Sequence, residues 1–537
     1  MLSESSYPPI DRPPHRRPYA VAVIDVGTTS LRMEIAEIHP DGRIRKLASY
    51  SQAVSLGKDA FSKRRIEKRT IEDCVHVLQT YRAQLNELGI DNPDRIRVIA
   101  TNAVAESTNR LAMLDRIFVA TGFEIELIDD AELHRVTYLG VLPAITENEK
   151  RFKNYTVVCE VSGGATEFLL LDGSDVVTAH SFRQGSLRLK QMVESVDAPR
   201  AQYRVLLESR IRKLCREISR ETDGVLGDDK VTSYIAMGGD IRFAATQVKH
   251  KRIDDRLIKL SVADVELFLD EILQLSEGQI ANKFHISLPD AASLAPALLC
   301  HTMIAKQTGA SSFFVAESNV RDGLITEMAQ GRRWSSSIQK QILRSASNLG
   351  RKFHYRENYA KRVAEISVQL FDGLHLLHQL GERFRGILEI AATLHEVGVS
   401  IATRSYHKHT MYLIRHSELF GIGSHDLELV ALVARYHRRA TPQPSHDGYS
   451  RLSRKDRVAV SKLAAILRVA KALNQSAELN VDEVNCRVHG DRVIIDCAGL
   501  SDVSVERAEL KQNGRFFEDI YGKRIQLSVD QASTPLQ

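Results

Sequence analysis

The sequence contains two copies of one pattern, in which an apolar segment, a short turn of small and polar residues and a second apolar segment follow one another. The first copy, VAVIDVGTTSLRMEIAEI, runs from Val21 to Ile38, and the second, YTVVCEVSGGATEFLLLDGSDV, from Tyr155 to Val176. Each copy predicts two antiparallel strands joined by a tight turn. Because a recurring pattern indicates a repeated structural unit, we expect two similar α/β half-domains that face each other across a cleft.

The turn of the first copy brings several polar side chains together at one end of its sheet. Gly27 lets the backbone approach a ligand closely, and short hydroxyl groups beside a carboxylate and a cation suit a phosphate group. An ordinary hairpin with a polar turn has the same local pattern, so this turn alone leaves both interpretations open. The polar residues concerned are Asp25, Thr28, Thr29, Ser30 and Arg32.

A third glycine turn, in YIAMGGDIRFAA from Tyr234 to Ala245, lies between a predicted strand and a predicted helix. A helix that begins directly after a loop of small residues presents backbone N–H groups that bind anions. Gly238 and Gly239 are therefore candidate anion-binding residues.

The chain is long enough to form several domains, because its 537 residues exceed what one hydrophobic core usually holds. Strands and helices alternate up to about Trp334, amphipathic helices then follow almost without interruption, and strand-like segments return beyond about Asn480. We therefore expect a flexible tail (1–18), two α/β domains (19–142 and 143–330), an all-α domain (331–477) and a small α+β module (478–537).

The composition narrows the partners and the compartment. The formal net charge of +5 is too weak by itself to separate a nucleic-acid binder from a protein that handles small or polymeric anions. We predict no specific nucleic-acid partner. The six cysteines are scattered without CxxC pairs, which fits a reducing cytoplasm. No apolar run approaches the roughly 20 residues that span a bilayer, and the amino-terminal segment lacks an apolar core. We therefore expect a cytoplasmic protein with no membrane segment.

Nine segments carry, in this order, a resemblance to one family: IDVGTTSLR, IATNAVAESTNR, IELIDDAELHRVTYLGV, VCEVSGGATEF, SFRQGSLRLK, IAMGGDIR, TLHEVG, RYHRR and FFEDIYGKRIQL. The chain resembles the exopolyphosphatase and guanosine-pentaphosphate phosphohydrolase (Ppx/GppA) family, a branch of the actin-like superfamily. The resemblance implies an α/β fold of two actin-like (ASKHA, ribonuclease H-like) domains. An all-α HD-like domain and a small strand-rich carboxyl-terminal module are expected to follow them.

The resemblance also implies a phosphohydrolase that holds terminal phosphates between the two actin-like domains, with Mg²⁺ as cofactor. Phosphoryl transfer requires positioning and cancellation of charge, which N–H groups, hydroxyl groups, a cation and acidic metal ligands supply. By this resemblance Asp25 and Glu160 hold the metal, while Glu132 and Glu167 are the catalytic carboxylates. The implied phosphate-binding residues are Gly27, Thr28, Thr29, Ser30, Arg32, Gly163, Gly164, Thr166, Gly238 and Gly239.

Several positions depart from the family pattern. Ala105 replaces an arginine thought to contact the substrate phosphate, and Leu133 replaces an acidic residue. Ser162 places a Cβ where the family has glycine, at a position that can require a positive φ. Ala165 lacks the usual hydroxyl group, and Asp240 adds a negative charge near the expected phosphates.

The helical domain departs further from a metal-binding HD centre. The segment TLHEVG supplies His395 and Glu396, but Tyr359 stands where the first histidine is expected and Lys471 where the late aspartate is expected. Because an ammonium group repels a metal ion, we interpret this domain as a non-catalytic HD relic. A basic group in this domain belongs either to a track for a polyanion or to a solvated helix end. That group consists of Arg435, His437, Arg438 and Arg439.

Three functions remain open on the sequence. The first is an exopolyphosphatase-type phosphohydrolase that releases orthophosphate from polyphosphate or guanosine pentaphosphate by Mg²⁺-assisted attack of water. The second is a catalytically weakened regulator that binds polyphosphate or (p)ppGpp, which Ala105, Leu133, Ser162 and Ala165 all favour. The third is a nucleotide-dependent kinase or ATPase on the same fold. A homodimer is expected from the resemblance, because dimerisation through the helical half is common among relatives.

Overall fold

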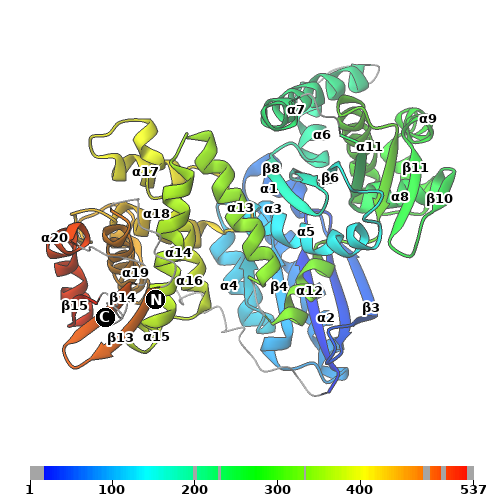
Figure 1. The fold of residues 1–537 in the computed structure, drawn as a ribbon. Coiled ribbons are helices and arrows are strands. Elements are labelled where there is room, and N and C mark those ends of the chain that lie inside the picture. Colours follow the sequence, from blue (N-terminus) through cyan, green and yellow to red (C-terminus); the bar gives the residue numbers. More distant parts are fainter. Residues whose placement is uncertain are drawn as a thin grey trace. The chain divides into compact units, whose positions relative to one another are not determined.

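The computed structural model describes residues 17–196, 202–227, 231–331, 334–475, 484–497 and 504–528. The chain divides into two compact units, Met1–Ser335 and Ser336–Gln537, coloured blue to green and green to red in Figure 1. Each unit is described below by itself. Nearly all of the expected flexible tail, 1–18, lies outside the described residues.

The first unit begins with a five-stranded sheet in the order β3-β2-β1-β4-β5. Strand β1 pairs antiparallel with β2 and parallel with β4. Alternate residues of β1 enter two separate cores, Ala22 and Ile24 on one face and Val21 and Val23 on the other, so its continuous apolar sequence reflects burial on both faces. The strands are β1 (Tyr19–Val26), β2 (Ser30–Ile38), β3 (Ile44–Ala53), β4 (Ile96–Ala100) and β5 (Ile125–Leu127). The helices are α1 (Leu56–Lys63), α2 (Lys68–Glu87), α3 (Asn102–Ala105) and α4 (Arg110–Thr121).

The second sheet repeats the order and strand directions of the first and adds two strands, giving β8-β7-β6-β9-β12-β11-β10. The two copies of the sequence pattern form the equivalent hairpins β1-β2 and β6-β7. The strands are β6 (Tyr155–Val161), β7 (Thr166–Asp172), β8 (Asp175–Phe182), β9 (Ser233–Met237), β10 (His250–Arg252), β11 (Leu257–Ser261) and β12 (Ser312–Ala316). The helices are α6 (Ser186–Glu194), α7 (Tyr203–Leu226), α8 (Gly239–Gln247), α9 (Val262–Leu273), α10 (Glu277–Phe284) and α11 (Leu288–Gln307). Among the described residues, α11 alone has the length and apolarity of a membrane span, and most of it is buried in the protein core.

The second unit is helical up to Leu473 and ends in a three-stranded sheet in the order β13-β14-β15. The change from an α/β to a helical pattern agrees with the change expected near Trp334. Its helices are α13 (Ser336–Lys352), α14 (Glu357–Gly373), α15 (His375–His378), α16 (Glu382–Leu394), α17 (Tyr406–Arg415), α18 (Ser424–Arg435), α19 (Arg454–Leu473) and α20 (Ser504–Tyr521). Its strands are β13 (Val484–His489), β14 (Arg492–Cys497) and β15 (Arg524–Ser528). The predicted α+β module therefore has strands and a helix in its described part.

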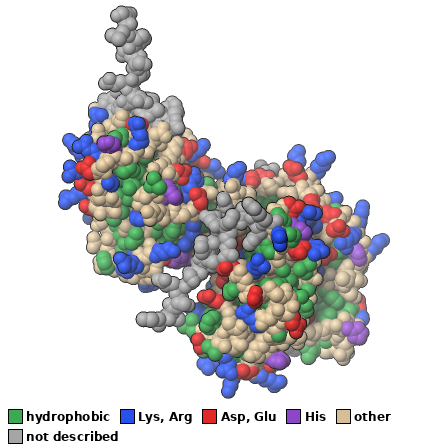
Figure 2. Space-filling model, turned by 90° about the horizontal axis from the view of Figure 1, so that it is seen from below, with side chains coloured by type: hydrophobic (Ala, Val, Ile, Leu, Met, Phe, Trp, Pro, Cys, Tyr) green, Lys and Arg blue, Asp and Glu red, His purple; other side chains and the backbone are tan. Residues whose placement is uncertain are grey.

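The face drawn in Figure 2 carries Lys and Arg side chains interspersed with Asp and Glu side chains. Dissolved salt at physiological ionic strength screens exposed charges from one another beyond about 8 Å. This face therefore offers a mixed surface to its surroundings.

Two helices cross between the sheets of the first unit, α5 (Asp130–Glu147) and α12 (Val320–Gln330). Although α12 follows the second sheet in the chain, its Leu324 and Ile325 enter the core beneath β1 together with Val136 of α5. A Cβ on Gly323 would overlap the carbonyl oxygen of Val136, so the two helix backbones touch directly. The expected second domain, 143–330, therefore needs one correction, because its last helix packs on the first sheet.

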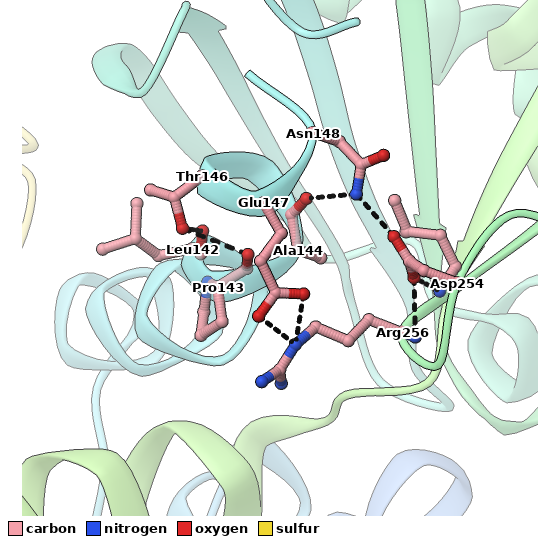
Figure 3. A network of polar contacts seen from close by, with 9 residues as sticks. Leu142, Pro143, Ala144, Thr146, Glu147, Asn148, Asp254 and Arg256 are labelled. Carbon is pink, nitrogen blue, oxygen red and sulfur yellow. Dashed lines mark hydrogen bonds and ion pairs between the residues drawn. The ribbon is translucent and has the colours of Figure 1, made fainter. Parts of the chain in front are cut away.

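The carboxyl-terminal end of α5 is fastened to the β10–β11 loop of the second sheet, as Figure 3 shows. Arg256 Nε lies 2.9 Å from both carboxylate oxygens of Glu147. The Asn148 amide donates to the carbonyl of Ala144 at 3.1 Å and to Asp254 Oδ2 at 2.6 Å. These contacts hold one end of α5 on the second sheet, while its amino-terminal end packs on the first.

Candidate active site

A cleft of about 290 Å³ lies between the two lobes of the first unit, where the first lobe is the first sheet with its helices and the second lobe is the second sheet with its helices. Its walls come from the turns of the two equivalent hairpins and from the turn between β9 and α8. All but two of the predicted site residues line this cleft. The lining residues are Asp25, Gly27, Thr28, Thr29, Ser30, Arg32, Glu160, Gly163, Gly164, Glu167, Gly238 and Gly239.

The two hairpins present matched positions to the cleft. In the first, Asp25 pairs in register with Arg32, and in the second, Glu160 pairs with Glu167, with the same seven-residue spacing. Each turn is closed by one backbone hydrogen bond, Gly27 N to Ser30 O at 3.1 Å in the first and Ser162 N to Ala165 O at 2.9 Å in the second. The sequence pattern therefore produces one turn geometry twice.

Glycine is required where the two hairpins approach each other. A Cβ on Gly163 would overlap the Thr28 hydroxyl of the opposite lobe, and a Cβ on Gly164 would lie 2.8 Å from the Phe61 ring. Ser162 needs no such freedom, because it is not among the residues with a positive φ. The strain considered for Ser162 is therefore absent, and its hydroxyl instead closes the turn by accepting from Ala165 N at 3.1 Å.

Two arginines of this region have different partners. Arg321, at the start of α12, lies 3.4 Å from Asp25 Oδ2 and 3.3 Å from Glu34 Oε2, so its charge is already paired. Arg32 lines the cleft and makes no hydrogen bond or ion pair within the part of the chain that the structure describes. A half-buried guanidinium of this kind has its donors available for an anion.

The carboxylate of Glu160 lacks a hydrogen-bond partner at one oxygen. Its Oε2 is buried and accepts no hydrogen bond within the described residues. Burial, together with the carboxylates of Glu167 and Asp25, raises the pKa of Glu160 to about 7 against the opposing charge of Arg242. A divalent cation between Asp25 and Glu160 would bind the unpartnered oxygen of Glu160 and would reduce the repulsion between the carboxylates.

Mg²⁺ fits this donor set. In proteins it commonly binds through one or two carboxylates and takes its remaining oxygens from phosphates and water. The described residues contain no cluster of three or more His, Cys, Asp or Glu side chains that could hold a metal by themselves. Asp25 and Glu160 therefore match a metal that arrives together with a phosphate ligand.

Glu167 has a close contact at each carboxylate oxygen. It is 1% exposed, and Ser181 Oγ donates a hydrogen bond to its Oε1 at 2.9 Å. His134 Nε2, from α5, lies 2.8 Å from its Oε2, an ion-pair distance without the geometry of a hydrogen bond. No local sequence pattern predicts the His134 contact, because 33 residues separate the two groups in the chain.

The two predicted residues that do not line the cleft have other surroundings. Glu132 is in the first turn of α5, where its N–H binds the capping Asp129 Oδ1 at 3.0 Å, and the next residue, Leu133, lines the cleft in its place. Thr166 is buried, and its hydroxyl donates to the carbonyl of Gln184 at 2.8 Å. The roles predicted for these two residues stay predictions.

The remaining wall of the cleft comes mainly from α8 and α11. Ser293 Oγ donates to Asp240 Oδ1 at 2.8 Å. Burial raises the pKa of Asp240 to about 6, although the Ser293 hydrogen bond lowers it. Residues that sequence reasoning did not assign also line the cleft: Thr101, Asn102, Ser186, Phe243, Ile286, Asp290 and Ser293. Thr101, Asn102 and Ser186 lie within the family-like segments, so those segments were the signal that could have found them.

The lobes also meet beside the position of Ala105. Arg188 of α6 forms an ion pair with Glu106 at 2.5 Å and lies over the Phe61 ring at 4.2 Å. Arg183, mostly exposed, lies 3.8 Å from the same carboxylate. The second lobe therefore supplies cations close to the place where the family arginine is missing.

The second unit contains its own buried polar cluster. Lys471 Nζ donates to the Tyr406 hydroxyl at 3.2 Å, and the same hydroxyl lies 3.1 Å from His437 Nε2. The His437 and His395 rings are 5.1 Å apart. Burial lowers the pKa of His395 to about 4, with Glu396 opposing the shift. This cluster contains a lysine ammonium in its interior.

Two sequence profiles match the chain: the Ppx/GppA phosphatase family over residues 34–331, and Ppx/GppA phosphatase, domain III, over residues 343–512. The chain is 22% identical over 518 residues to a guanosine-5'-triphosphate,3'-diphosphate pyrophosphatase from Vibrio vulnificus, covering 93% of this chain and 96% of that protein. The protein of the same description from Vibrio campbellii is 21% identical over 503 residues, covering 91% and 94%. Among solved structures, an exopolyphosphatase from Cytophaga hutchinsonii is similar with a TM-score of 0.52 at 18% identity, covering 58% of this chain and 99% of that one. This likeness shows a shared fold.

Proposed function

The chain belongs to the Ppx/GppA phosphatase family, and we propose that it is a Mg²⁺-dependent phosphohydrolase. Its substrate in this proposal is inorganic polyphosphate or guanosine pentaphosphate, from which it releases terminal orthophosphate. The observation that carries the proposal is the composition of the cleft. One space combines two opposed glycine turns, the guanidinium of Arg32, which has no ion-pair partner among the described residues, and the carboxylates of Asp25, Glu160 and Glu167.

The glycine turns and Arg32 bind the terminal phosphate in this proposal. Backbone N–H groups at Gly163 and Gly164 come close to a ligand because no side chain stands between. The turn at Gly238 and Gly239 opens α8, where the helix dipole adds partial positive charge. Arg32 then cancels charge on the transferred group, which is what phosphoryl transfer mainly requires of a protein.

Glu167 acts on the attacking water. Its carboxylate accepts a hydrogen bond from Ser181 and lies 2.8 Å from His134 Nε2, so its motion is restricted and it orients a water molecule with less entropy loss than a mobile side chain. It also accepts the proton that the water releases as the new bond to phosphorus forms. When bound between Asp25 and Glu160, Mg²⁺ supplies charge stabilisation for the phosphate oxygens.

The decisive experiment measures orthophosphate release from polyphosphate, guanosine pentaphosphate and ATP, with and without Mg²⁺. We expect Mg²⁺-dependent release from polyphosphate or guanosine pentaphosphate. Glu167→Ala is expected to abolish release while the fold stays intact, and the exposed Glu149→Ala serves as the matched control. Release from ATP alone would contradict the proposal in favour of a kinase-like or ATPase activity.

A regulatory function is the second candidate, because Leu133 places an apolar side chain in the cleft where the family pattern has an acid. In that case the cleft binds polyphosphate or (p)ppGpp and hydrolyses it slowly or not at all. Calorimetric binding of either ligand to the wild-type protein, combined with no orthophosphate release, would support the regulator.

Further parts of the proposal concern the fold and the assembly. We place the two lobes among actin-like domains and the second unit among HD-like domains. Tyr359, His395, Glu396 and Lys471, expected at the HD ligand positions, lie in one cluster of ring and charge contacts. Because Lys471 brings a positive charge to that cluster, the residues do not fit a metal ion, and we derive no metal chemistry there. A cytoplasmic location and a homodimer complete the proposal.

A further inference from the structure

We propose that His134 is a positioning residue that fixes the carboxylate of Glu167 for its action on the attacking water. The inference rests on the proposed function and adds a residue to it. The chain reads DDAELHR here, so His134 directly follows Leu133, which replaces an acidic residue of the family pattern.

The geometry places the imidazole on the side of Glu167 that faces away from Ser181. His134 is 3% exposed on α5, and its Nε2 lies 2.8 Å from Glu167 Oε2. Ser181, from β8, donates to the other oxygen at 2.9 Å. One hydrogen bond and one close N···O contact, from two different elements, therefore restrict the carboxylate, although Glu167 still lines the cleft.

The charges around this pair explain why a positioning contact matters. Glu160 pairs with Glu167 across the hairpin, and Asp130 of α5 also acts on this region, where burial and the Glu167 charge raise its pKa. Several carboxylates that repel one another would otherwise turn Glu167 out of place. The imidazole of His134 contacts Glu167 without adding another negative charge to this group of carboxylates.

The same arrangement offers an account of the departure at Leu133. The family pattern has a run of acids on this helix, whereas this chain has lost one of them from the cleft wall. A single carboxylate then has to orient the water, and a rigid one does so better than a mobile one. His134 supplies that rigidity from the helix that carries the substitution.

The test compares two variants of one residue by steady-state kinetics. His134→Leu removes the polar contact to Glu167 at similar volume, and we expect kcat to fall about 10- to 100-fold with KM for the substrate little changed. His134→Gln keeps a polar group beside the carboxylate, so it is expected to recover most of the lost kcat. Thr137→Val, a buried change one turn further along α5, is the matched control and should leave kcat unaltered.

A measurement without turnover separates this inference from the proposed function. Melting temperatures of His134→Leu, Glu167→Gln and the double variant form a cycle, in which the double loss should be smaller than the sum of the single losses. Additive losses would overturn the contact, and a kcat unchanged in His134→Leu would overturn its role. A wild-type protein that binds substrate without hydrolysing it would refute the proposed function. The positioning role of His134 would then be refuted too, even if the melting temperatures showed that His134 and Glu167 are coupled.

Discussion

Replacement of Glu160 by glutamine tests the electrostatics of the cleft without requiring activity. Burial raises the pKa of this carboxyl from its ordinary value of 4.5 to about 7. Above pH 7 the carboxyl is therefore ionised in both states, and its ionisation costs more free energy in the folded protein than in the unfolded chain. Between pH 4.5 and 7 the folded state binds the proton that the unfolded state releases, so stability falls as pH rises through this window. Glu160→Gln removes the titrating group and keeps the shape.

The difference of about 2.5 between the two pKa values corresponds to about 3 kcal/mol at pH 8. At pH 5, where Glu160 is protonated in the folded protein, the same linkage gives less than about 1 kcal/mol. For the first unit of 335 residues, an unfolding entropy of about 2.1 cal/mol/K per residue converts the pH 8 value to a rise in Tm of about 4 °C.

The assay is differential scanning calorimetry of the full chain at pH 8 and pH 5, first in a chelating buffer. The first unit of Glu160→Gln should melt higher than that of the wild type at pH 8 and nearly equally at pH 5. Added Mg²⁺ should then raise the wild-type Tm, by an amount equivalent to about 2.7 kcal/mol at 100 times Kd, and leave the variant unmoved. A variant that melts no higher than the wild type at pH 8 would refute the reasoning, and the exposed Glu149→Gln provides the control.

Other changes test the remaining parts of the cleft. Arg32→Ala should raise the KM for a phosphate substrate at least tenfold, because it removes an unpaired charge-assisted donor, while Arg32→Lys should retain part of the affinity. Gly163→Ala should lower kcat and substrate affinity together, because the added Cβ overlaps Thr28. The control Gly278→Ala, whose Cβ meets no described atom within 4 Å, should change neither. Equal activity of the two variants would contradict the close approach of the hairpins. Asp240→Asn should lower KM mainly above pH 6, where the wild-type carboxylate is charged and repels phosphate. A difference in KM that does not grow with pH would contradict a position of Asp240 near the substrate.

The duplicated hairpins were predictable from sequence because their signal is local. Apolar strands on either side of a small polar turn specify a hairpin wherever they occur, and equal spacing specifies equal register. Asp25 and Glu160 therefore lie at matched ends of β1 and β6. The turn between β9 and α8 was predictable for the same reason, and Gly238 has the positive φ of +117° that favours glycine there.

Other features depend on contacts that no local pattern contains. The amphipathic sequence of α12 predicts a buried face but not which sheet it covers, so its return to the first sheet was missed. Arg321 meets Asp25 across 296 residues of chain, and His134 meets Glu167 across 33. A one-residue difference in helix phase also decides that Leu133 rather than Glu132 lines the cleft.

The register of the two hairpins has a consequence for how this protein can evolve. At the position that carries Arg32 in one copy, the other copy carries Glu167, although the surrounding backbone is the same. If the two hairpins were exact copies, both would carry an arginine or both would carry a glutamate at this position. Divergence at this single pair of sites gives the two halves opposite charges at one matched position, so the halves are not interchangeable although their hairpins share one register.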